Sequence, residues 1–370
     1  MKIGIITFHA SFNYGSMLQA YALQTFLERN GHEVKIINFR TDKQKGMYPK
    51  PLRFNSRNRI KQSIKRILLE PSSIGPLYKK WHLFDQFLNS HLHITKEFST
   101  EEELKYANLK YDLLITGSDQ IWNTDCGDYS DAYFGNFVDN STPKIAYAVS
   151  MGPHPETKNP NYYKKIVKNF KAISVREQRT KDFLEKNGIY NNVEVVVDPT
   201  MILDKDNWDK LIGDKPLIKG DYMFYYTPFG PNYKLLDEGV KIANELDLPI
   251  VCDNSYGIRS LKNYPMVRPY SAVGPIEFLN LIKNAKVVCG GSFHLMVFSI
   301  IFGKEFYCIN GDIDSRVQNL AKIAGVEDRM WSLRNKEKNY IHPYKKSLSN
   351  KLEVARTDSM RFLLNNIEGV

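Results

Sequence analysis

The sequence lacks several features that would place the protein in a membrane or outside the cell. No stretch of its 370 residues approaches the roughly 18 consecutive apolar residues of a transmembrane helix. The N-terminus has no extended apolar segment of the signal-peptide kind and passes directly into a predicted strand. The four cysteines are widely spaced and form no Cys-x-x-Cys pair, so neither a disulfide framework nor a zinc site is indicated. We therefore expect a cytoplasmic protein without a metal site.

Positive charge is concentrated in one window of the chain. The formal net charge is +10, and residues 40–80 contain twelve Lys and Arg residues but only two acidic ones. This window alone accounts for the excess, and prolines surround a short predicted helix, 57–69, within it. A second helix is predicted at residues 78–88. We interpret the window as an insertion into the first domain or a lid on it. Its charge suits an anionic membrane, a nucleic acid or another anionic polymer, or it is only a solvated surface. We favour peripheral contact with the inner membrane face and expect no nucleic acid.

Short apolar strands alternate with helical segments along most of the chain, a pattern typical of parallel sheets. Strands are predicted at residues 2–8, 33–39, 111–116, 144–150, 172–175, 193–197, 222–227, 249–252, 286–289 and 305–309. This alternation predicts an α/β fold of two doubly wound, Rossmann-like domains that face each other across a cleft, a GT-B-like arrangement. We place the domains at residues 1–195 and 196–350. Residues 351–370 are expected to form a helix that packs back on the first domain.

The stretch from residue 286 to 304 combines a buried strand, a turn and an apolar helix. Val287–Cys289 form the predicted strand, and Gly290 and Gly291 form the turn. Ser292 and Phe293 begin the helix, and His294 lies in its first turn. A helix that starts just beyond a strand offers unpaired N–H groups and a positive dipole end to an anion. The stretch therefore indicates a ligand site containing a titratable group. The alternative is a tight turn followed by a histidine with a purely structural role.

Polar side chains follow three other predicted strands, at the end where open α/β sheets bind ligands. After the first strand come Asn13, Tyr14 and Gly15, in a loop before a helix predicted at residues 17–30; after residues 111–116 come Ser118, Asp119, Gln120, Trp122 and Asn123; after residues 172–175 come Arg176 and Glu177. Hydroxyl, amide and carboxylate groups beside an indole suit a sugar, and an arginine can grip phosphate or carboxylate. The alternatives are an Asx-turn with a packed Trp122 and a structural ion pair between Arg176 and Glu177.

Taken in order, these motifs resemble the polysaccharide pyruvyl transferase family. The matching segments are Asn13-Tyr-Gly with Leu18-Gln-Ala-Tyr-Ala-Leu23, Leu113-Leu-Ile-Thr-Gly-Ser-Asp-Gln-Ile-Trp-Asn123, Ile173-Ser-Val-Arg-Glu177, Val197-Asp-Pro-Thr200, Ser292-Phe-His with Phe298-Ser and Gly303-Lys, and Ser315-Arg-Val-Gln-Asn-Leu320. Each segment alone is a weak signal. The ordered set is fairly specific, above all the segment that ends at Asn123.

The resemblance implies an enzyme that moves the pyruvyl group of phosphoenolpyruvate onto two hydroxyls of a sugar. The product would be a cyclic ketal on a polysaccharide or its lipid-linked precursor, and phosphate would leave. No cofactor is implied. Residues 1–195 would be the acceptor side and 196–350 the donor side. His294 would be the acid/base, Arg176 the anion clamp, and Asp119 a ligand of the acceptor hydroxyl or a second base.

The sequence departs from the family pattern around its histidine. Many relatives look like Arg-x-His here, whereas this chain has Ser292 two positions before His294, and Leu295 replaces a frequent glycine. We expect Arg316, at the next junction of strand and helix, to supply the missing charge. Two alternatives remain: a GT-B glycosyltransferase that places the diphosphate of a nucleotide-sugar at the Gly290 turn, and a non-catalytic glycan-binding protein that uses the basic window and Trp122.

Overall fold

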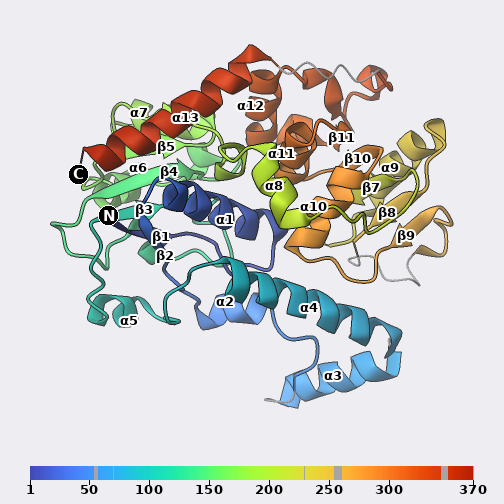
Figure 1. Cartoon of the computed structure of the whole chain (residues 1–370), viewed down its shortest axis with the longest axis horizontal. Helices are drawn as coiled ribbons and strands as arrows, with labels where there is room; N and C mark the ends of the chain where they lie inside the picture. The colour runs from blue at the N-terminus through green and yellow to red at the C-terminus, as the bar shows by residue number, and fades with distance from the viewer. Residues whose placement is uncertain (54–56, 70, 229, 254–260, 343–348, 370) are drawn as a thin grey trace.

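The computed structural model has two α/β halves, each built on a parallel sheet of six strands (Figure 1). It describes residues 1–53, 57–69, 71–228, 230–253, 261–342 and 349–369. The first sheet has the order β2-β1-β3-β4-β5-β6. Its strands are β1 (Lys2–Ile6), β2 (Glu33–Ile36), β3 (Leu113–Thr116), β4 (Lys144–Val149), β5 (Ala172–Val175) and β6 (Glu194–Val195).

The second sheet has the order β12-β11-β10-β7-β8-β9. Its strands are β7 (Met223–Tyr226), β8 (Ile250–Cys252), β9 (Val267–Pro269), β10 (Val287–Gly290), β11 (Glu305–Ile309) and β12 (Met330–Trp331). The sequence predicts neither β9 nor β12. Both are edge strands of two or three residues, too short to show a periodic pattern.

Helices cover both faces of the two sheets. In the first half they are α1 (Tyr14–Arg29), α2 (Asp42–Met47), α3 (Arg57–Leu69), α4 (Pro71–His91), α5 (Glu101–Tyr106), α6 (Pro160–Ile166) and α7 (Gln178–Lys186). They continue with α8 (Lys205–Ile212), α9 (Tyr233–Glu245), α10 (Pro275–Asn284), α11 (Phe293–Ile301), α12 (Ser315–Ala324) and α13 (Asn350–Glu368). The alternation of strand and helix is the one that the sequence predicts, and the predicted fold class is confirmed.

Each sheet has one point at which the strand order reverses. In the first sheet this point lies between β1 and β3, and in the second between β7 and β10. The chain leaves the carboxyl ends of these strands through the loops that carry Asn13, Asp119, Thr227 and Gly291. Ligands of doubly wound proteins bind in the crevice at such reversal points. The topology thus directs attention to these four loops.

The two halves meet through an aromatic contact between α1 and α10. The ring of Tyr14 stacks on Phe278 with centroids 4.5 Å apart and planes 5° apart, and its edge meets Tyr226 at 5.1 Å. The Tyr14 hydroxyl donates to Asp253 Oδ2 at 3.0 Å, across the two halves. One continuous apolar core includes residues of both sheets.

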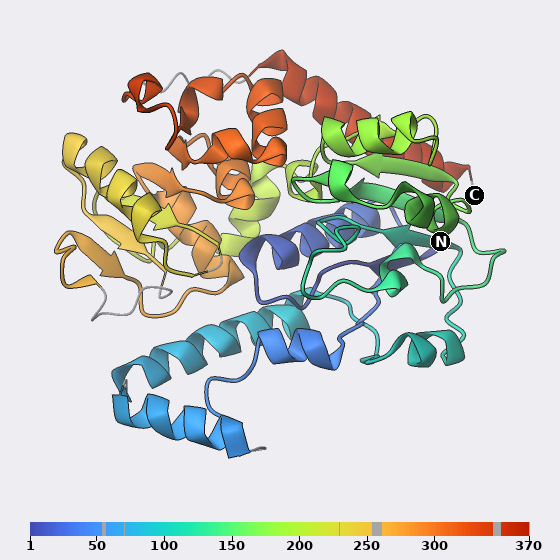
Figure 2. The same cartoon turned by 180° about the vertical axis from the view of Figure 1, so that it is seen from behind.

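The C-terminal helix α13 lies along the first half (Figures 1 and 2). Its Phe362 ring packs near Tyr147 of β4, and the Val197 N–H donates to Ser359 Oγ at 2.8 Å. Lys171 Nζ donates to the Gly369 carbonyl at 2.6 Å. The helix that begins in the second half thus ends against the first.

The basic window contains α2, α3 and the first half of α4, and α3 and α4 project below both sheets (Figures 1 and 2). The sequence predicts α3 correctly but places the second helix at residues 78–88 only. Helix α4 starts earlier because Pro71 occupies its first position, where a missing N–H costs no helical hydrogen bond. Residues 54–56 and 70 of the window lie outside the described residues. Among the helices that the structure describes, none is long and apolar enough to span a bilayer.

Candidate active site

His294 lies in the first turn of α11, at the junction of the two halves. Strand β10 ends at Gly290, and the Ser292 hydroxyl accepts the Leu295 N–H at 3.4 Å, which caps the helix. The predicted order of strand, turn and capped helix is confirmed. The histidine is 8% exposed, and its Nε2 lies 3.5 Å from Asp198 Oδ2, an ion-pair distance rather than a well-formed hydrogen bond.

The two glycines before α11 are needed for contact with strand β7 rather than for binding a ligand. Gly290 has φ +152°, and a Cβ there would lie 1.8 Å from the Tyr226 carbonyl oxygen. The Gly291 N–H donates to the same carbonyl at 3.3 Å. The expected cradle of glycine N–H groups is therefore wrong at Gly291, because strand β7 already uses that donor.

A second helix start meets the histidine from the other half. The Asn13 side chain accepts the N–H groups of Gly15 and Ser16 at 3.0 and 3.3 Å, so α1 begins at Tyr14. The sequence places Tyr14 and Gly15 in a loop, and this is wrong because Asn13 caps the helix one turn earlier. A Cβ on Gly15 would lie 2.0 Å from His294 Nδ1. The imidazole therefore rests directly on the backbone of α1.

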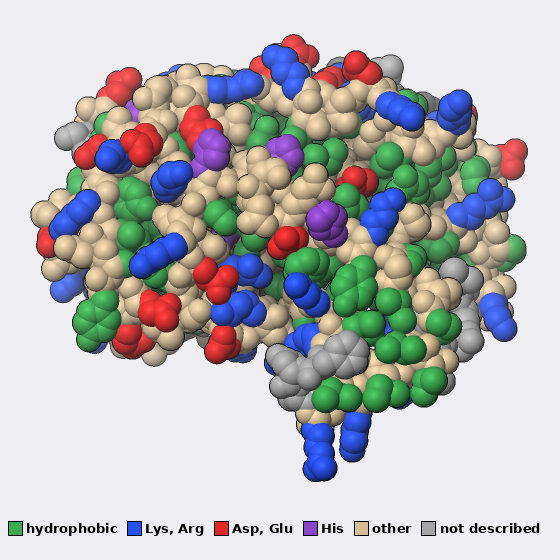
Figure 3. All heavy atoms as spheres, turned by 60° about the horizontal axis from the view of Figure 1, so that its bottom comes forward, with side chains coloured by type: hydrophobic (Ala, Val, Ile, Leu, Met, Phe, Trp, Pro, Cys, Tyr) green, Lys and Arg blue, Asp and Glu red, His purple; other side chains and the backbone are tan. Residues whose placement is uncertain are grey.

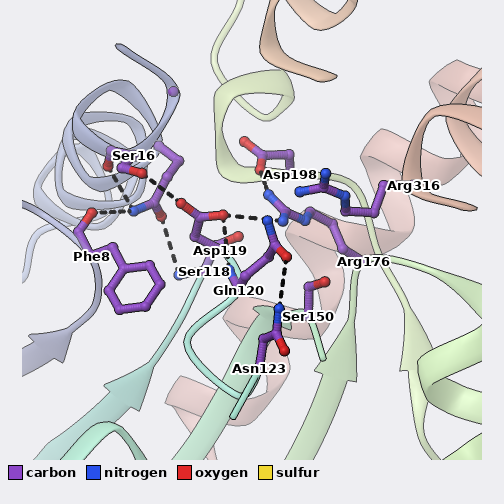
Figure 4. Close-up of polar contacts among 12 residues, drawn as sticks. Phe8, Ser16, Ser118, Asp119, Gln120, Asn123, Ser150, Arg176, Asp198 and Arg316 are labelled. Carbon is purple, nitrogen blue, oxygen red and sulfur yellow. Dashed lines mark hydrogen bonds and ion pairs between the residues drawn. The ribbon is translucent and has the colours of Figure 1, made fainter. Parts of the chain in front are cut away.

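Arg176 joins two carboxylates in the same cluster (Figure 4). Its Nη1 donates to Asp198 Oδ2 at 2.8 Å and its Nη2 to Asp119 Oδ1 at 3.2 Å. The Ser16 hydroxyl donates to the other Asp119 oxygen at 2.7 Å. All three charged residues are buried. The cluster assembles the ends of β3, β5 and β6 beneath the start of α1.

These neighbours shift the pKa values of the cluster. Burial by itself would raise the pKa of the Asp198 carboxyl, but His294 and Arg176 outweigh it and hold that pKa well below its usual range. The pKa of Asp119 is likewise lowered: Arg176, His294 and Ser16 outweigh its burial. Burial would lower the pKa of Arg176, yet the two carboxylates raise it. The aspartates are anions and the arginine a cation at neutral pH.

Arg316 lies beside this cluster on α12 (Figure 4). Its guanidinium makes two hydrogen bonds to Asp314, of 3.0 and 2.6 Å. The Phe293 ring packs against two guanidinium carbons, that of Arg176 at 4.9 Å and that of Arg316 at 5.8 Å. The phenyl ring of the helix start thus holds both arginines next to His294.

Three carboxylates therefore face two guanidiniums around the imidazole. They are Asp119, Asp198 and Asp314, with Arg176 and Arg316. The expected anion clamp, Arg176, has both ends of its guanidinium engaged by aspartates in this arrangement. Arg316 pairs with one carboxylate only and is the more exposed of the two. An anion would most readily exchange with Asp314 for the guanidinium of Arg316.

Two expected sugar ligands lie inside the protein. Trp122 is fully buried and stacks on Phe134 with centroids 5.0 Å apart. Ser118 is fully buried, and its hydroxyl donates to the Ala148 carbonyl at 2.9 Å. Their assignment to substrate is wrong, because apolar packing and the backbone use these groups. Gln120 and Asn123 bond to each other at 3.2 Å beside Gly152, at the edge of the cluster (Figure 4).

Glu177 points away from the cluster. Its Oε1 accepts the hydroxyls of Ser150 and Thr180, and the residue is fully buried. Burial raises the pKa of its carboxyl, against the lowering effects of Arg176 and these two hydroxyls. The interpretation as a structural ion pair with Arg176 is not supported, since Arg176 bonds to aspartates instead.

Asp198 is the residue of this site that reasoning from the sequence missed. It follows β6 in the segment Val197-Asp-Pro-Thr200, and only the strand end before it signals a site. Side chains of both halves meet at this carboxylate, Arg176 from the first and His294 from the second. Ser16 was missed as well, because the start of α1 was placed too late.

A cavity of about 170 Å³ lies between the halves, next to the start of α1. Its wall includes Tyr14, Tyr48 and Tyr226, together with Lys80 and Asp253. Asp253 directly follows the predicted strand 249–252, which is the one signal that could have found it, whereas Tyr48 belongs to no recognisable motif.

Solved structures with the same arrangement define the fold class. The structure resembles the UDP-GlcNAc 2-epimerase of Methanocaldococcus jannaschii with a TM-score of 0.54 and 16% identity, over 99% of this chain and 100% of that one. It also resembles that of Rickettsia bellii, with a TM-score of 0.57 and 10% identity over 100% and 96% of the two chains. At these identities the likeness concerns the fold alone, which is GT-B. No curated protein matches the sequence.

A family assignment follows from the sequence. The family model described as Polysaccharide pyruvyl transferase matches residues 13–313. The chain belongs to this family and is therefore a transferase. A sugar or polysaccharide acceptor is consistent with the family. The match contains every residue of the cluster except Asp314 and Arg316.

Proposed function

We propose that the protein transfers the pyruvyl group of phosphoenolpyruvate to two hydroxyls of a sugar, on a polysaccharide or its lipid-linked precursor. The observation that carries the proposal is the position of His294. In a chain of this family, a histidine between two helix starts contacts Asp198 and lies beside two arginines. Such a site offers proton transfer next to groups that hold an anion.

The reaction balances without a further reactant. Two bonds form between sugar oxygens and the second carbon of the donor, and the bond from that carbon to the phosphate oxygen breaks. One hydroxyl proton ends on the methylene carbon, which becomes a methyl group, and the other leaves with phosphate. His294 moves the proton between hydroxyl and methylene, and Asp198 stabilises the imidazolium that forms in between. Asp119 orients the attacking hydroxyl.

The donor carries a phosphate and a carboxylate, which need cationic partners. Arg316 is best placed to bind them by exchanging Asp314 for the donor. The starts of α1 and α11 add two positive dipole ends on either side of the histidine. Arg176 holds Asp119 and Asp198 in place and so orients the groups that act on the acceptor.

The test uses phosphoenolpyruvate as the sole donor. The protein is incubated with it and a set of methyl glycosides, and released phosphate and the mass of each glycoside are measured. We expect equal amounts of phosphate and ketal, and a rise in melting temperature with phosphoenolpyruvate but not with UDP- or GDP-sugars. Stabilisation by a nucleotide-sugar together with glycosyl transfer would overturn the proposal in favour of a glycosyltransferase.

We further propose that residues 40–80 contact the anionic inner face of a membrane, where lipid-linked acceptors would be reached. Helix α3 supports this. It contains no acidic residue, and its apolar side chains Ile64, Ile67 and Leu68 are exposed, Leu68 by 73%. Figure 3 shows hydrophobic side chains beside projecting basic ones on this part of the surface. An exposed helix of this composition suits the boundary between headgroups and acyl chains.

A further inference from the structure

The cavity between the halves is built from the ends of strands in both sheets. Tyr14 comes from the start of α1, and Tyr226 and Asp253 directly follow or end strands of the second sheet. Tyr48 ends α2, and Lys80 belongs to α4, so the basic insertion supplies the remaining wall. Five separate segments thus converge on one space at the reversal points of the two sheets, where doubly wound proteins bind ligands.

The chemistry of the wall is aromatic and electrically balanced. Lys80 Nζ lies 2.9 Å from Asp253 Oδ2, and the Tyr14 hydroxyl donates to the same oxygen. One cation thus faces one anion. The rings of Phe12 and Tyr48 lie with their centroids 6.2 Å apart and tilted by 32° along another side. Phosphoenolpyruvate, which carries several negative charges, would gain little from a neutral pair of this kind.

A sugar ring matches this wall. Its hydroxyls can bond to an ammonium and a carboxylate at once, and its C–H face packs on aromatic rings. The ammonium of Lys80 carries three donors, more than Asp253 takes up. At about 170 Å³ the cavity has room for one ring and not for a longer oligosaccharide. The buried Trp122 cannot provide the aromatic face that a sugar needs, whereas Tyr48 is only partly buried.

The cavity also adjoins the histidine. Tyr14 lines it, and the next residue along α1, Gly15, supports the His294 ring. On the other side Thr227 lines it, and a Cβ built on Gly291 would lie 3.9 Å from the Thr227 methyl group. Tyr14 is therefore one residue from the glycine that supports the imidazole, and Thr227 lies beside a glycine three residues before His294.

We infer that this cavity binds one sugar ring of the acceptor, held by Tyr48, Lys80 and Asp253 beside His294. The inference rests on the proposed function only for the reaction that the bound sugar undergoes. The binding of the sugar does not depend on that function. It assigns to the basic insertion a second role, since α4 brings Lys80 from that insertion into the junction. The donor remains on the Arg316 side of the histidine.

The test compares two lysines that follow one another on α4. Lys80→Met and Tyr48→Ala should raise the acceptor KM about ten- to a hundredfold, the loss expected for hydrogen bonds to a charged group and for ring contact. Lys79→Met, on the exposed neighbour, should leave it unchanged. The donor KM and the melting-temperature shift by phosphoenolpyruvate should stay the same in all three. An unchanged acceptor KM in both cavity variants, or a raised donor KM instead, would overturn the inference.

A binding measurement separates this inference from the proposed function. Methyl glycosides are added without phosphoenolpyruvate, and their binding is followed by ligand-observed NMR. Binding to the wild type and to Lys79→Met, but not to Tyr48→Ala, supports the cavity even if no pyruvyl transfer occurs. Tyr48→Ala keeps Lys80 and Tyr14, which bond to Asp253 across the halves. Equal glycoside binding in the wild type and Tyr48→Ala, or no glycoside binding in the wild type, would refute it.

Discussion

Asp198 connects the side chains on which the proposed chemistry depends. One of its oxygens, Oδ2, contacts both Arg176 and His294, at 2.8 and 3.5 Å. A carboxylate in this position fixes the orientation of the ring, as in other sites where an acid orients a histidine. The sequence marks Asp198 only as the residue after the predicted strand 193–197 and as part of the segment Val197-Asp-Pro-Thr200, and neither signal assigns it this function.

Arg316 is the residue whose role depends most on the proposal. Arg316→Ala should raise the donor KM at least tenfold, because the donor would lose its exchangeable cation. Steady-state kinetics with varied phosphoenolpyruvate measure this. Arg179→Ala is the control, since it removes a surface arginine paired with Glu156 and should change nothing. A donor KM that stays at the wild-type value would exclude Arg316 from donor binding.

The buried carboxyl of Glu177 leads to a separate prediction about how the stability of the protein depends on pH. The pKa of its carboxyl is raised in the folded protein, so the stability it contributes is fully present below the unfolded pKa of about 4.3 and is lost as pH rises through the folded pKa. In Glu177→Gln this loss is absent. The difference in melting temperature, variant minus wild type, should therefore become more positive from pH 4 to pH 8. A difference that is constant or falls with pH would contradict the raised pKa.

At the scale of elements, the two helix starts that meet at His294 are the structural basis of the site. The sequence predicts the start of α11 from Ser292 and its preceding strand, and the structure agrees. It places the start of α1 too late, since Asn13 was interpreted as a loop residue rather than as a cap. Helix caps outside a strong apolar pattern are often ambiguous in this way, because the same side chains also form turns.

Gly15→Ala tests the contact between the two helices. The added Cβ would lie 2.0 Å from His294 Nδ1, so the imidazole has to move. A displacement on the order of 1 Å lowers a rate by about a hundredfold, and we expect kcat to fall by that order. Gly46→Ala is the matched control: a Cβ there meets nothing within 4 Å, and alanine favours a helix. If the two alanine variants have the same kcat, His294 does not act from this position.

Substitutions in helix α3 test the proposed contact with a membrane. Lys61→Gln with Lys65→Gln should weaken binding to phosphatidylglycerol vesicles about thirtyfold, at roughly 1 kcal/mol for each basic residue. Ile64→Ser with Leu68→Ser should weaken it also. Tyr106→Ser is the control, because Tyr106 is 88% exposed but lies on α5. Co-sedimentation that is insensitive to salt and to all these changes would contradict a peripheral contact.

At the scale of the whole molecule, the sequence predicts more of the architecture than of the site. Alternating strands and helices predict two doubly wound halves, because that pattern depends on local periodicity. The joint between the halves depends on side chains far apart in the chain, such as Tyr14 with Phe278 and Lys80 with Asp253. Burial of Trp122 could not be foreseen for the same reason: a tryptophan after a strand suits a core and a sugar platform equally well.

The candidate active site forms where the two halves meet. Residues of the first half, from α1 and from the ends of β3 and β5, meet His294 and Arg316 of the second half around Asp198. Neither half holds the histidine, the aspartates and both arginines by itself. The proposed reaction places donor and acceptor on opposite sides of the same imidazole.

Single-turnover phosphate release from phosphoenolpyruvate, with a sugar acceptor present, measures the role of that imidazole most directly. The wild type and His294→Gln are compared with both substrates saturating. Our account predicts a rate lower by about a hundred- to ten-thousandfold in the variant, the usual contribution of a positioned acid/base, with the thermal shift by phosphoenolpyruvate retained. Equal rates of phosphate release in the two proteins would contradict it.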